Sequence, residues 1–407
     1  MPVHTFGPIR QRWPSSPVLA RRNVGPMRTP SPRAQALLLP LVPLVVLGLG
    51  RFAYGALLPA MRTDLGWGYR DAAVPAIGNG AGYLIGALTA SWYTARVGSR
   101  TAAASMTAVT AVVLAATGAF PSLMWITGCR LVSGATGAWA YVAGGVLATD
   151  LRQRGVLGAL TWFPAGGGAG VVLSVGAGLW LEHHPASWPL AWVVFGVAGV
   201  LAAWIIARTA RGTSAIYVAQ VPHLGGFRLA PAAVMAGYCL FGAGYIGYST
   251  FVLSYLAQHD VAAVWRHVFW ATVGVATMVA APLWHRFIER LPRGWPLGVP
   301  MAGCTASTVL VLASQHPAAI ALAAVTLGGC WLNTTAGVAV VVRRGVGPAE
   351  WGRAFAALTA AFGVGQMVGP IATFGIGDGQ VGVAPVLGVS AVVLGTGAAV
   401  AGFAGRD

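Results

Sequence analysis

Long apolar runs alternate along the chain with short, arginine-rich connections. Each run has roughly the 20 residues that a helix needs to cross the hydrocarbon core of a membrane. Helices are expected rather than strands, because a helix satisfies its own backbone hydrogen bonds in lipid. Twelve runs lie near residues 34–60, 72–94, 101–120, 123–148, 156–181, 188–208, 229–256, 264–287, 296–314, 317–342, 353–377 and 382–404. The pattern predicts an all-α polytopic membrane protein with 12 transmembrane helices.

Composition narrows the class further. Of 407 residues, 57% are hydrophobic and 8% are charged, which excludes an ordinary soluble domain. A net charge of +16 would suggest nucleic-acid binding in a soluble protein, but here the arginines gather in the connections between apolar runs. We therefore expect the lipid bilayer as partner and no nucleic acid. The four cysteines lack zinc-ligand spacing, and no metal site is predicted.

The arginines also predict topology. With a cytoplasmic N-terminus, nearly all of them fall on the inner side, and the outer side carries only Arg62, Arg70 and Arg266. The positive-inside rule then places both termini in the cytoplasm. We expect a disordered Arg/Pro-rich cytoplasmic tail (1–33), a first six-helix half (34–208), a cytoplasmic linker (209–228) and a second six-helix half (229–407). An organelle transit peptide is the alternative interpretation of the tail.

The two halves show short internal similarities. The segment 48–54 aligns with 242–248, and 159–161 with 357–359, both followed or flanked by glycines. Similar offsets in the two cases indicate the internal repeat that many secondary transporters contain.

With these features the chain resembles the major facilitator superfamily (MFS) over residues 34–404. R130-L-V-S-G134-A-T-G137-A on the fourth run is similar to the superfamily's R-x-x-x-G-x-x-G-A pattern, and A95-R96-V-G98-S-R100 to its D-R-x-G-R-R gating signature, with Ala95 in place of the aspartate. The strings 50–54, 78–87, 244–251 and 359–370 resemble the YbfB/YjiJ branch of bacterial MFS transporters. The resemblance implies the MFS fold, transport by alternating access, and the bacterial cytoplasmic (inner) membrane. Gating residues expected from these motifs, and from a kink late in the eleventh run, are Arg96, Gly98, Arg100, Gly134, Gly137, Gly369 and Pro370.

An arginine inside the first apolar run carries the functional prediction. A guanidinium at membrane depth costs at least a few kcal/mol unless something compensates it. A rise of about 1.5 Å per residue places Arg51, Asn79, Arg130 and Tyr248 in one layer, roughly 10 to 12 Å below the outer surface. The predicted substrate-binding residues are Arg51, Tyr54, Asn79, Tyr83, Arg130, Tyr245, Tyr248 and Gln366.

Two cations without a clear carboxylate nearby favour a small anionic substrate, because a guanidinium matches a carboxylate with two parallel hydrogen bonds. The alternatives are structural. Arg51 could snorkel or bind backbone carbonyls, Arg130 could serve packing or gating, and Asn79 and Gln366 could form interhelical hydrogen bonds.

Proton coupling is possible, but ionisable groups such as Glu182 and His267 lie at the ends of the runs, where solvated boundary residues are common. No other cofactor is expected, and neither is an enzyme, because the runs contain no nucleophile–base or metal-binding motif. The prediction is a monomeric secondary transporter of an organic anion. Efflux of drugs or metabolites by the same fold, and a sensor that does not transport, are the alternatives.

Overall fold

The structure is a computed structural model that describes residues 30–209, 232–347, 350–372 and 382–404. Within these ranges every regular element is a helix, as the apolar runs predict. The tail before residue 30 and nearly all of the expected linker lie outside the described residues.

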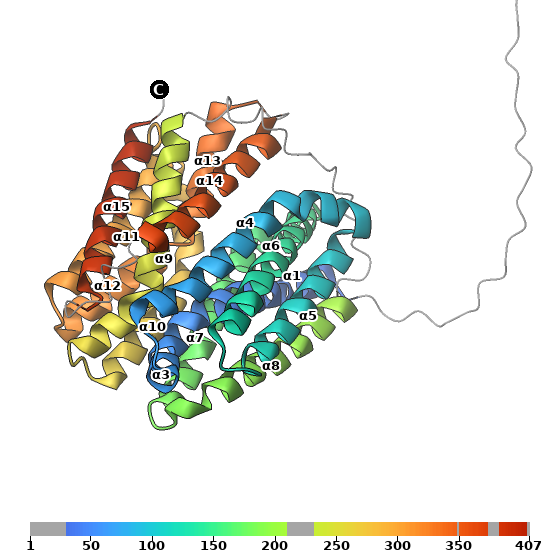
Figure 1. The fold of residues 1–407 in the computed structure, drawn as a ribbon. Coiled ribbons are helices and arrows are strands. Elements are labelled where there is room, and N and C mark those ends of the chain that lie inside the picture. The colour runs from blue at the N-terminus through green and yellow to red at the C-terminus, as the bar shows by residue number, and fades with distance from the viewer. Residues whose placement is uncertain (1–29, 210–231, 348–349, 373–381, 405–407) are drawn as a thin grey trace, which may run out of the picture.

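The described part of the first half forms six long helical segments, the first built from four consecutive short elements. The elements are α1 (Pro32–Leu38), α2 (Leu41–Pro43), the π-helix η1 (Leu44–Phe52), α3 (Ala53–Leu65), α4 (Tyr69–Val97), α5 (Ser99–Thr117), α6 (Leu123–Gln153), α7 (Ala159–Leu181), the 3₁₀ turn η2 (Pro185–Ser187) and α8 (Trp188–Thr209). Figure 1 shows them, in blue to green, as one group of helices.

The second half forms the other group. Its elements are α9 (Ala232–Gln258), α10 (Ala263–Ile288), α11 (Trp295–Ala313), α12 (Pro317–Cys330), α13 (Asn333–Gly345), α14 (Trp351–Ala372) and α15 (Ala384–Phe403). These helices are yellow to red in Figure 1. The elements α12 and α13 follow one another directly and make a single long span.

Eleven segments of the described chain are long and apolar enough to cross a membrane. The expected second span coincides with α4, which has 29 residues but is not among the eleven. Its glycines and polar residues, Asn79 and Tyr83 among them, lower its mean hydropathy. The multi-pass helical fold is therefore confirmed, and the count of twelve spans stays a prediction.

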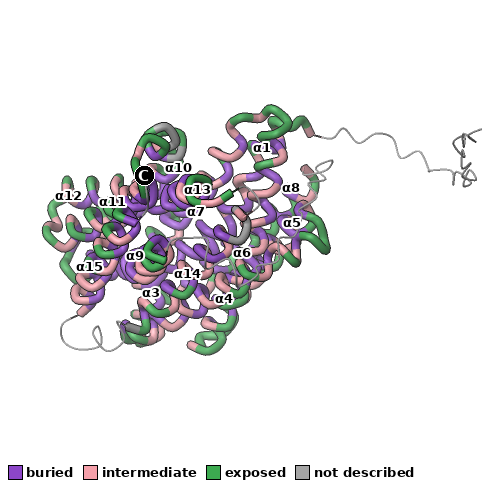
Figure 2. The backbone as a smooth tube through the Cα atoms, turned by 90° about the horizontal axis from the view of Figure 1, so that it is seen from above, coloured by how far each residue is buried: buried purple, intermediate pink, exposed green. Residues whose placement is uncertain are grey.

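The most extensive contacts between the described parts of the two halves are those of α7 with α10, α4 with α14, and α3 with α9. Inside the first half, α4 packs closely on α6. A Cβ added to Gly134 would lie 2.2 Å from the carbonyl oxygen of Asn79, so only glycine allows this approach. Seen from above, buried residues gather toward the middle of the molecule and exposed ones toward its margins (Figure 2).

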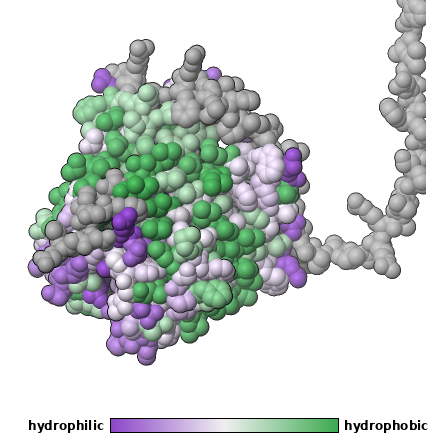
Figure 3. All heavy atoms as spheres, in the orientation of Figure 1, coloured by the Kyte–Doolittle hydropathy of each residue, from purple (hydrophilic) through white to green (hydrophobic). Residues whose placement is uncertain are grey.

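The lateral surface is apolar, unlike that of a soluble protein. Large hydrophobic side chains such as Trp92, Leu131 and Leu173 are exposed on their helices. Figure 3 shows hydrophobic residues across the middle of one face, with the most hydrophilic residues toward its margins. This distribution fits a belt in contact with lipid.

The bundle has two ends, named here by a residue at each. At the Glu182 end α3 and α7 stop and α4 and α10 start, and this end carries Arg62, Arg70 and Arg266. At the Arg100 end α4, α6 and α8 stop and α5 starts. Its described arginines include Arg96, Arg100, Arg152, Arg154, Arg208, Arg343 and Arg344.

Candidate functional site

Arg51 lies near the end of the π-helix η1, and its side chain is buried between the halves. Proline residues at positions 40 and 43 lack backbone N–H donors and precede the π-helical turns. Such segments inside α-helices often occur at functional sites. Arg51 is only 7% exposed, so a charged side chain lies buried among apolar neighbours.

The guanidinium of Arg51 has aromatic neighbours and unused donors. It lies 5.0 Å from the ring centre of Tyr83 on α4 and 5.9 Å from that of Tyr245 on α9, close enough for cation–π attraction. Its Nε and Nη2 are buried and have no hydrogen-bond partner in the described protein. A buried charged donor without a partner is costly, so these N–H groups point to a ligand.

Arg130 on α6 is also buried, at 1% exposure, but it is held by the protein. Its Nη1 donates a short hydrogen bond to the carbonyl oxygen of Gly50, and Nη2 donates to that of Arg51 at 3.2 Å. Its guanidinium also lies 5.0 Å from the Tyr54 ring centre and 5.8 Å from that of Trp192. Its Nε is buried without a hydrogen-bond partner in the described protein, but both Nη atoms bind the π-helix that carries Arg51.

A small cavity joins these residues. Its lining residues come from both halves: Arg51, Phe52, Tyr54, Gly55, Ala76, Asn79, Arg130, Ile246, Ser249 and Thr250. Among the described residues, neither arginine is within ion-pair distance of a carboxylate. The cavity volume of about 10 Å³ holds about one water molecule, so the site is closed around its own side chains.

Two predicted site residues in this cavity also hold neighbouring helices. Asn79 Nδ2 donates to the carbonyl oxygen of Arg130 at 3.1 Å and to Ser133 Oγ at 3.3 Å. Tyr54 Oη donates to the carbonyl oxygen of Ala72 at 2.7 Å. Both side chains therefore fix the geometry of the cavity wall.

Gln366 on α14 faces α4 across the boundary between the halves. A Cβ added to Gly80 would lie 3.3 Å from Gln366 Cβ. The Gln366 side chain is fully buried, and neither its Oε1 nor its Nε2 has a hydrogen-bond partner in the described protein. Its neighbour in the fold, Phe362, packs edge-on to Tyr83.

Tyr248 takes a different direction from the expected one. Its hydroxyl bonds Ser307 Oγ on α11 at 2.8 Å, inside the second half. The next residues on α9, Ser249 and Thr250, line the central cavity instead. Ser249 and Thr250 are not among the predicted site residues, although they share the layer that the helical rise assigns to Tyr248.

The residues predicted for gating lie in two regions. Arg96, Gly98 and Arg100 surround the α4–α5 turn, where Gly98 has a φ of +83° that favours glycine. Arg100 Nη2 donates to the carbonyl oxygen of Ala207 at 2.6 Å, and the Arg96 guanidinium lies over the Trp92 ring. Gly134 and Gly137 lie on α6, and Gly369 and Pro370 lie within α14.

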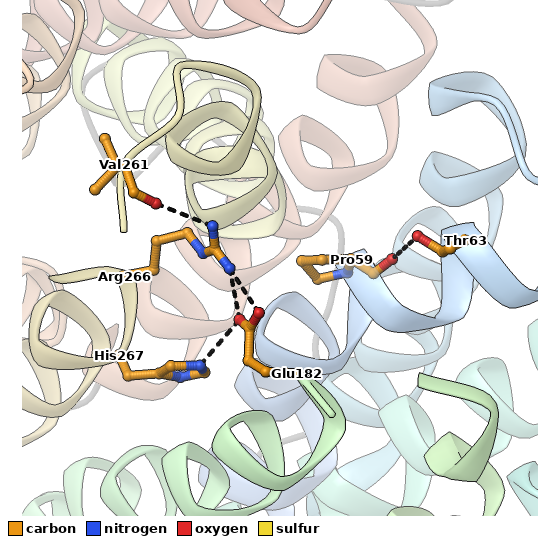
Figure 4. A network of polar contacts seen from close by, with 6 residues as sticks. All are labelled: Pro59, Thr63, Glu182, Val261, Arg266 and His267. Atoms are coloured by element: carbon orange, nitrogen blue, oxygen red, sulfur yellow. Dashed lines mark hydrogen bonds and ion pairs between the residues drawn. The ribbon is translucent and has the colours of Figure 1, made fainter. Parts of the chain in front are cut away.

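A second polar cluster joins the halves at the Glu182 end (Figure 4). Glu182 follows α7 and accepts two hydrogen bonds from Arg266 Nη2 on α10, at 2.6 and 2.8 Å. Its Oε1 also lies 3.1 Å from His267 Nε2. Partial burial raises the pKa of Glu182, but the hydrogen bonds and charges of Arg266 and His267 lower it by more. The net result is a pKa below the ordinary value. The positions of these residues at the ends of apolar runs had instead predicted solvated boundary groups.

Comparison with known proteins places the chain in a family. The family described as "Uncharacterised MFS-type transporter YbfB" matches residues 43–402, almost the whole of the described bundle. The chain belongs to this family of MFS transporters. The resemblance of the sequence motifs to the YbfB branch is thus confirmed.

Solved structures of other proteins have the same fold as this chain. The crystal structure of the nucleoside transporter NupG superimposes with a TM-score of 0.69 at 14% sequence identity, covering 91% of this chain and 97% of NupG. A mutant of NupG gives 0.67 at 12% identity, covering 91% and 98%. No curated protein matches the sequence. At these identities the likeness establishes the MFS fold and leaves the substrate to be argued from the site.

Proposed function

We propose that this MFS transporter is a secondary active transporter of a small organic anion, and that Arg51 is the main contact of the anionic group. The observation that carries the proposal is the pair of unpartnered N–H groups on the buried Arg51 guanidinium. A carboxylate supplies the negative charge and two acceptors that these donors lack.

The charge of the whole cavity supports an anion. Two guanidiniums line it, and its other lining residues are neutral. Two positive charges in a low-dielectric interior repel a cationic drug and attract a carboxylate. Arg130 binds backbone carbonyls through both Nη atoms, so its charge contributes from a fixed position with Nε alone unpartnered, whereas two nitrogens of Arg51 have no partner in the described protein.

The way the halves meet supports alternating access. The site lies between them, and the Glu182–Arg266–His267 cluster joins them at one end. We infer that the Glu182 end faces the outside of the bacterial cytoplasmic membrane, because the arginine-rich opposite end suits the cytoplasm. Rocking of the halves about the central site would expose Arg51 to each side in turn.

One observation favours a second candidate, a neutral planar solute such as a nucleoside. The unpartnered amide of Gln366 can recognise a heterocycle edge, and Tyr83, Tyr245 and Phe362 offer ring faces. NupG, a structural neighbour, is a nucleoside transporter. A neutral substrate, however, leaves the charge of Arg51 uncompensated.

Uptake into proteoliposomes tests the proposal, with labelled benzoate, succinate and uridine as probes. Arg51→Gln should abolish carboxylate uptake, and Arg51→Lys should retain a fraction because it keeps the charge and loses the planar fork. Arg152→Gln, which removes an exposed arginine at the Arg100 end, is the matched control and should transport normally. Normal carboxylate uptake by folded Arg51→Gln protein, or uptake of uridine alone, would refute the proposal.

A further inference from the structure

A larger cavity lies between the halves at the Glu182 end. Its volume is about 310 Å³, at the lower limit of small-molecule sites. Its lining residues are Ala56, Pro59, Ala60, Thr63, Gly178, Leu181, Glu182, Pro185, Leu253, Arg266 and His267. We call this cavity the end chamber. Figure 4 shows Glu182 between Arg266 and His267, with Pro59 and Thr63 on the facing helix.

The end chamber already contains a bound carboxylate, which belongs to the protein. Both oxygens of Glu182 accept from Arg266 Nη2, and Arg266 Nη1 donates to the carbonyl oxygen of Val261 at 3.0 Å. The Arg266 side chain is 18% exposed, so it is reachable from the chamber. An arginine held in this way can exchange one carboxylate for another.

Only a thin barrier separates the end chamber from the central cavity. Ala56 lines the chamber, and the preceding residue, Gly55, lines the central cavity. A Cβ added to Gly55 would lie 2.8 Å from the carbonyl oxygen of Ser249, so α3 and α9 touch there. Arg51 is five residues before Ala56, roughly 7.5 Å along the helix. The α3–α9 contact at Gly55 and Ser249 therefore lies between a solute in the chamber and Arg51.

We propose that the end chamber is an entry site for the transported anion, in which Arg266 exchanges Glu182 for the carboxylate of the substrate. This inference rests on the proposed function, which supplies the anionic substrate and the outward orientation of the Glu182 end. Loss of the Glu182–Arg266 contact removes an ion pair between the end of α7 and α10. Anion binding to Arg266 therefore favours separation of the two halves at this end. His267 keeps the displaced Glu182 in place through its Nε2.

Protons act on the same exchange. Among the residues that line the chamber, Glu182, Arg266 and His267 are the charged or titratable ones, and the lining residues from α3 and α9 are neutral. Asp64, at the end of α3, instead accepts a hydrogen bond from Trp188 Nε1 at 2.8 Å. His183 and His184 follow Glu182 and are exposed. Protonation of Glu182 frees Arg266 for an incoming anion, which provides a route for proton coupling.

Calorimetric titration of purified protein with benzoate tests the chamber, using Arg51→Gln as background so that the central site is silent. This background should retain one weak benzoate site. Adding Glu182→Gln should tighten binding about tenfold because the internal competitor is gone, and adding Arg266→Gln should abolish it. Arg266→Lys should bind more weakly than the background while folding normally. Asp64→Asn, which removes a nearby acid outside the chamber, should leave the affinity unchanged.

Unchanged affinity in the Glu182→Gln or Arg266→Gln proteins, or no benzoate site in the Arg51→Gln background, would overturn the chamber proposal. Failure of the proposed function is a separate result. It would appear as normal uptake by the Arg51→Gln protein. In that case the benzoate affinities of the Glu182 and Arg266 variants can still be compared in a chain that keeps Arg51, and they test the chamber by themselves.

Discussion

Replacing each central arginine by glutamine should have different effects on stability. Arg130 donates two hydrogen bonds to backbone carbonyls of Gly50 and Arg51 and contacts two aromatic rings. Charged hydrogen bonds contribute about 1.5–3 kcal/mol each, and cation–π contacts about 0.5–2 kcal/mol. After allowing for the desolvation cost that the charge no longer bears, Arg130→Gln should lower the free energy of unfolding by about 2–4 kcal/mol.

Arg51→Gln should instead be neutral or stabilising. Two of its N–H groups lack partners in the protein, so glutamine removes an uncompensated charge and loses chiefly the attraction to Tyr83 and Tyr245. Denaturant unfolding of both variants in one detergent, followed by tryptophan fluorescence, measures the difference. A larger loss of stability for Arg51→Gln than for Arg130→Gln would refute the assignment of Arg51 to the ligand and Arg130 to the scaffold.

Three further predictions follow from the polar groups. Gln366→Leu should weaken transport and leave the melting temperature equal or higher, because an unsatisfied buried amide costs about 1–3 kcal/mol; a lower melting temperature would contradict this. The contact of Glu182 with Arg266 is fully present above the ordinary carboxyl pKa and is lost as the pH falls through the lowered pKa of Glu182. A cysteine at Ala56 should therefore react faster in acid, relative to one at exposed Ala186. Glu182→Gln should remove this pH dependence. In intact cells a cysteine at Ala186 should react with an impermeant thiol reagent, while one at Gln153 should react only after permeabilisation; the reverse pattern would invert the topology.

Hydrophobic pattern was sufficient to predict the helices, because length and apolarity are strong signals in membrane proteins. The α4 helix shows the limit of this signal. Its glycines and polar residues serve packing and the site, and they reduce the hydropathy that identifies a span. Likewise, the π-helical turns that carry Arg51 depend on local hydrogen bonding that apolar periodicity does not reveal.

Helical rise also placed part of the site. It brought Arg51, Asn79 and Arg130 to one depth, and all three line the central cavity. Depth alone does not give direction around a helix, since each residue turns by about 100°. Tyr248 therefore points to Ser307, and its neighbours Ser249 and Thr250 face the cavity.

The cluster at the Glu182 end could not be predicted from sequence pattern. Glu182 and Arg266 are 84 residues apart, and they meet only because α7 packs on α10 across the two halves. Each residue alone has the position of an ordinary helix-end charge. The pairing depends on the tertiary arrangement, which periodicity and composition do not encode.

The most direct test of anion recognition by Arg51 compares carboxylates with their amides in a thermal-shift measurement on purified protein. Each pair, such as benzoate and benzamide, differs in charge and little in shape. The account predicts that carboxylates raise the melting temperature of the wild-type protein, that amides do not, and that Arg51→Gln loses most of the carboxylate effect. Equal stabilisation by both members of a pair, or an undiminished carboxylate effect in Arg51→Gln, would contradict it.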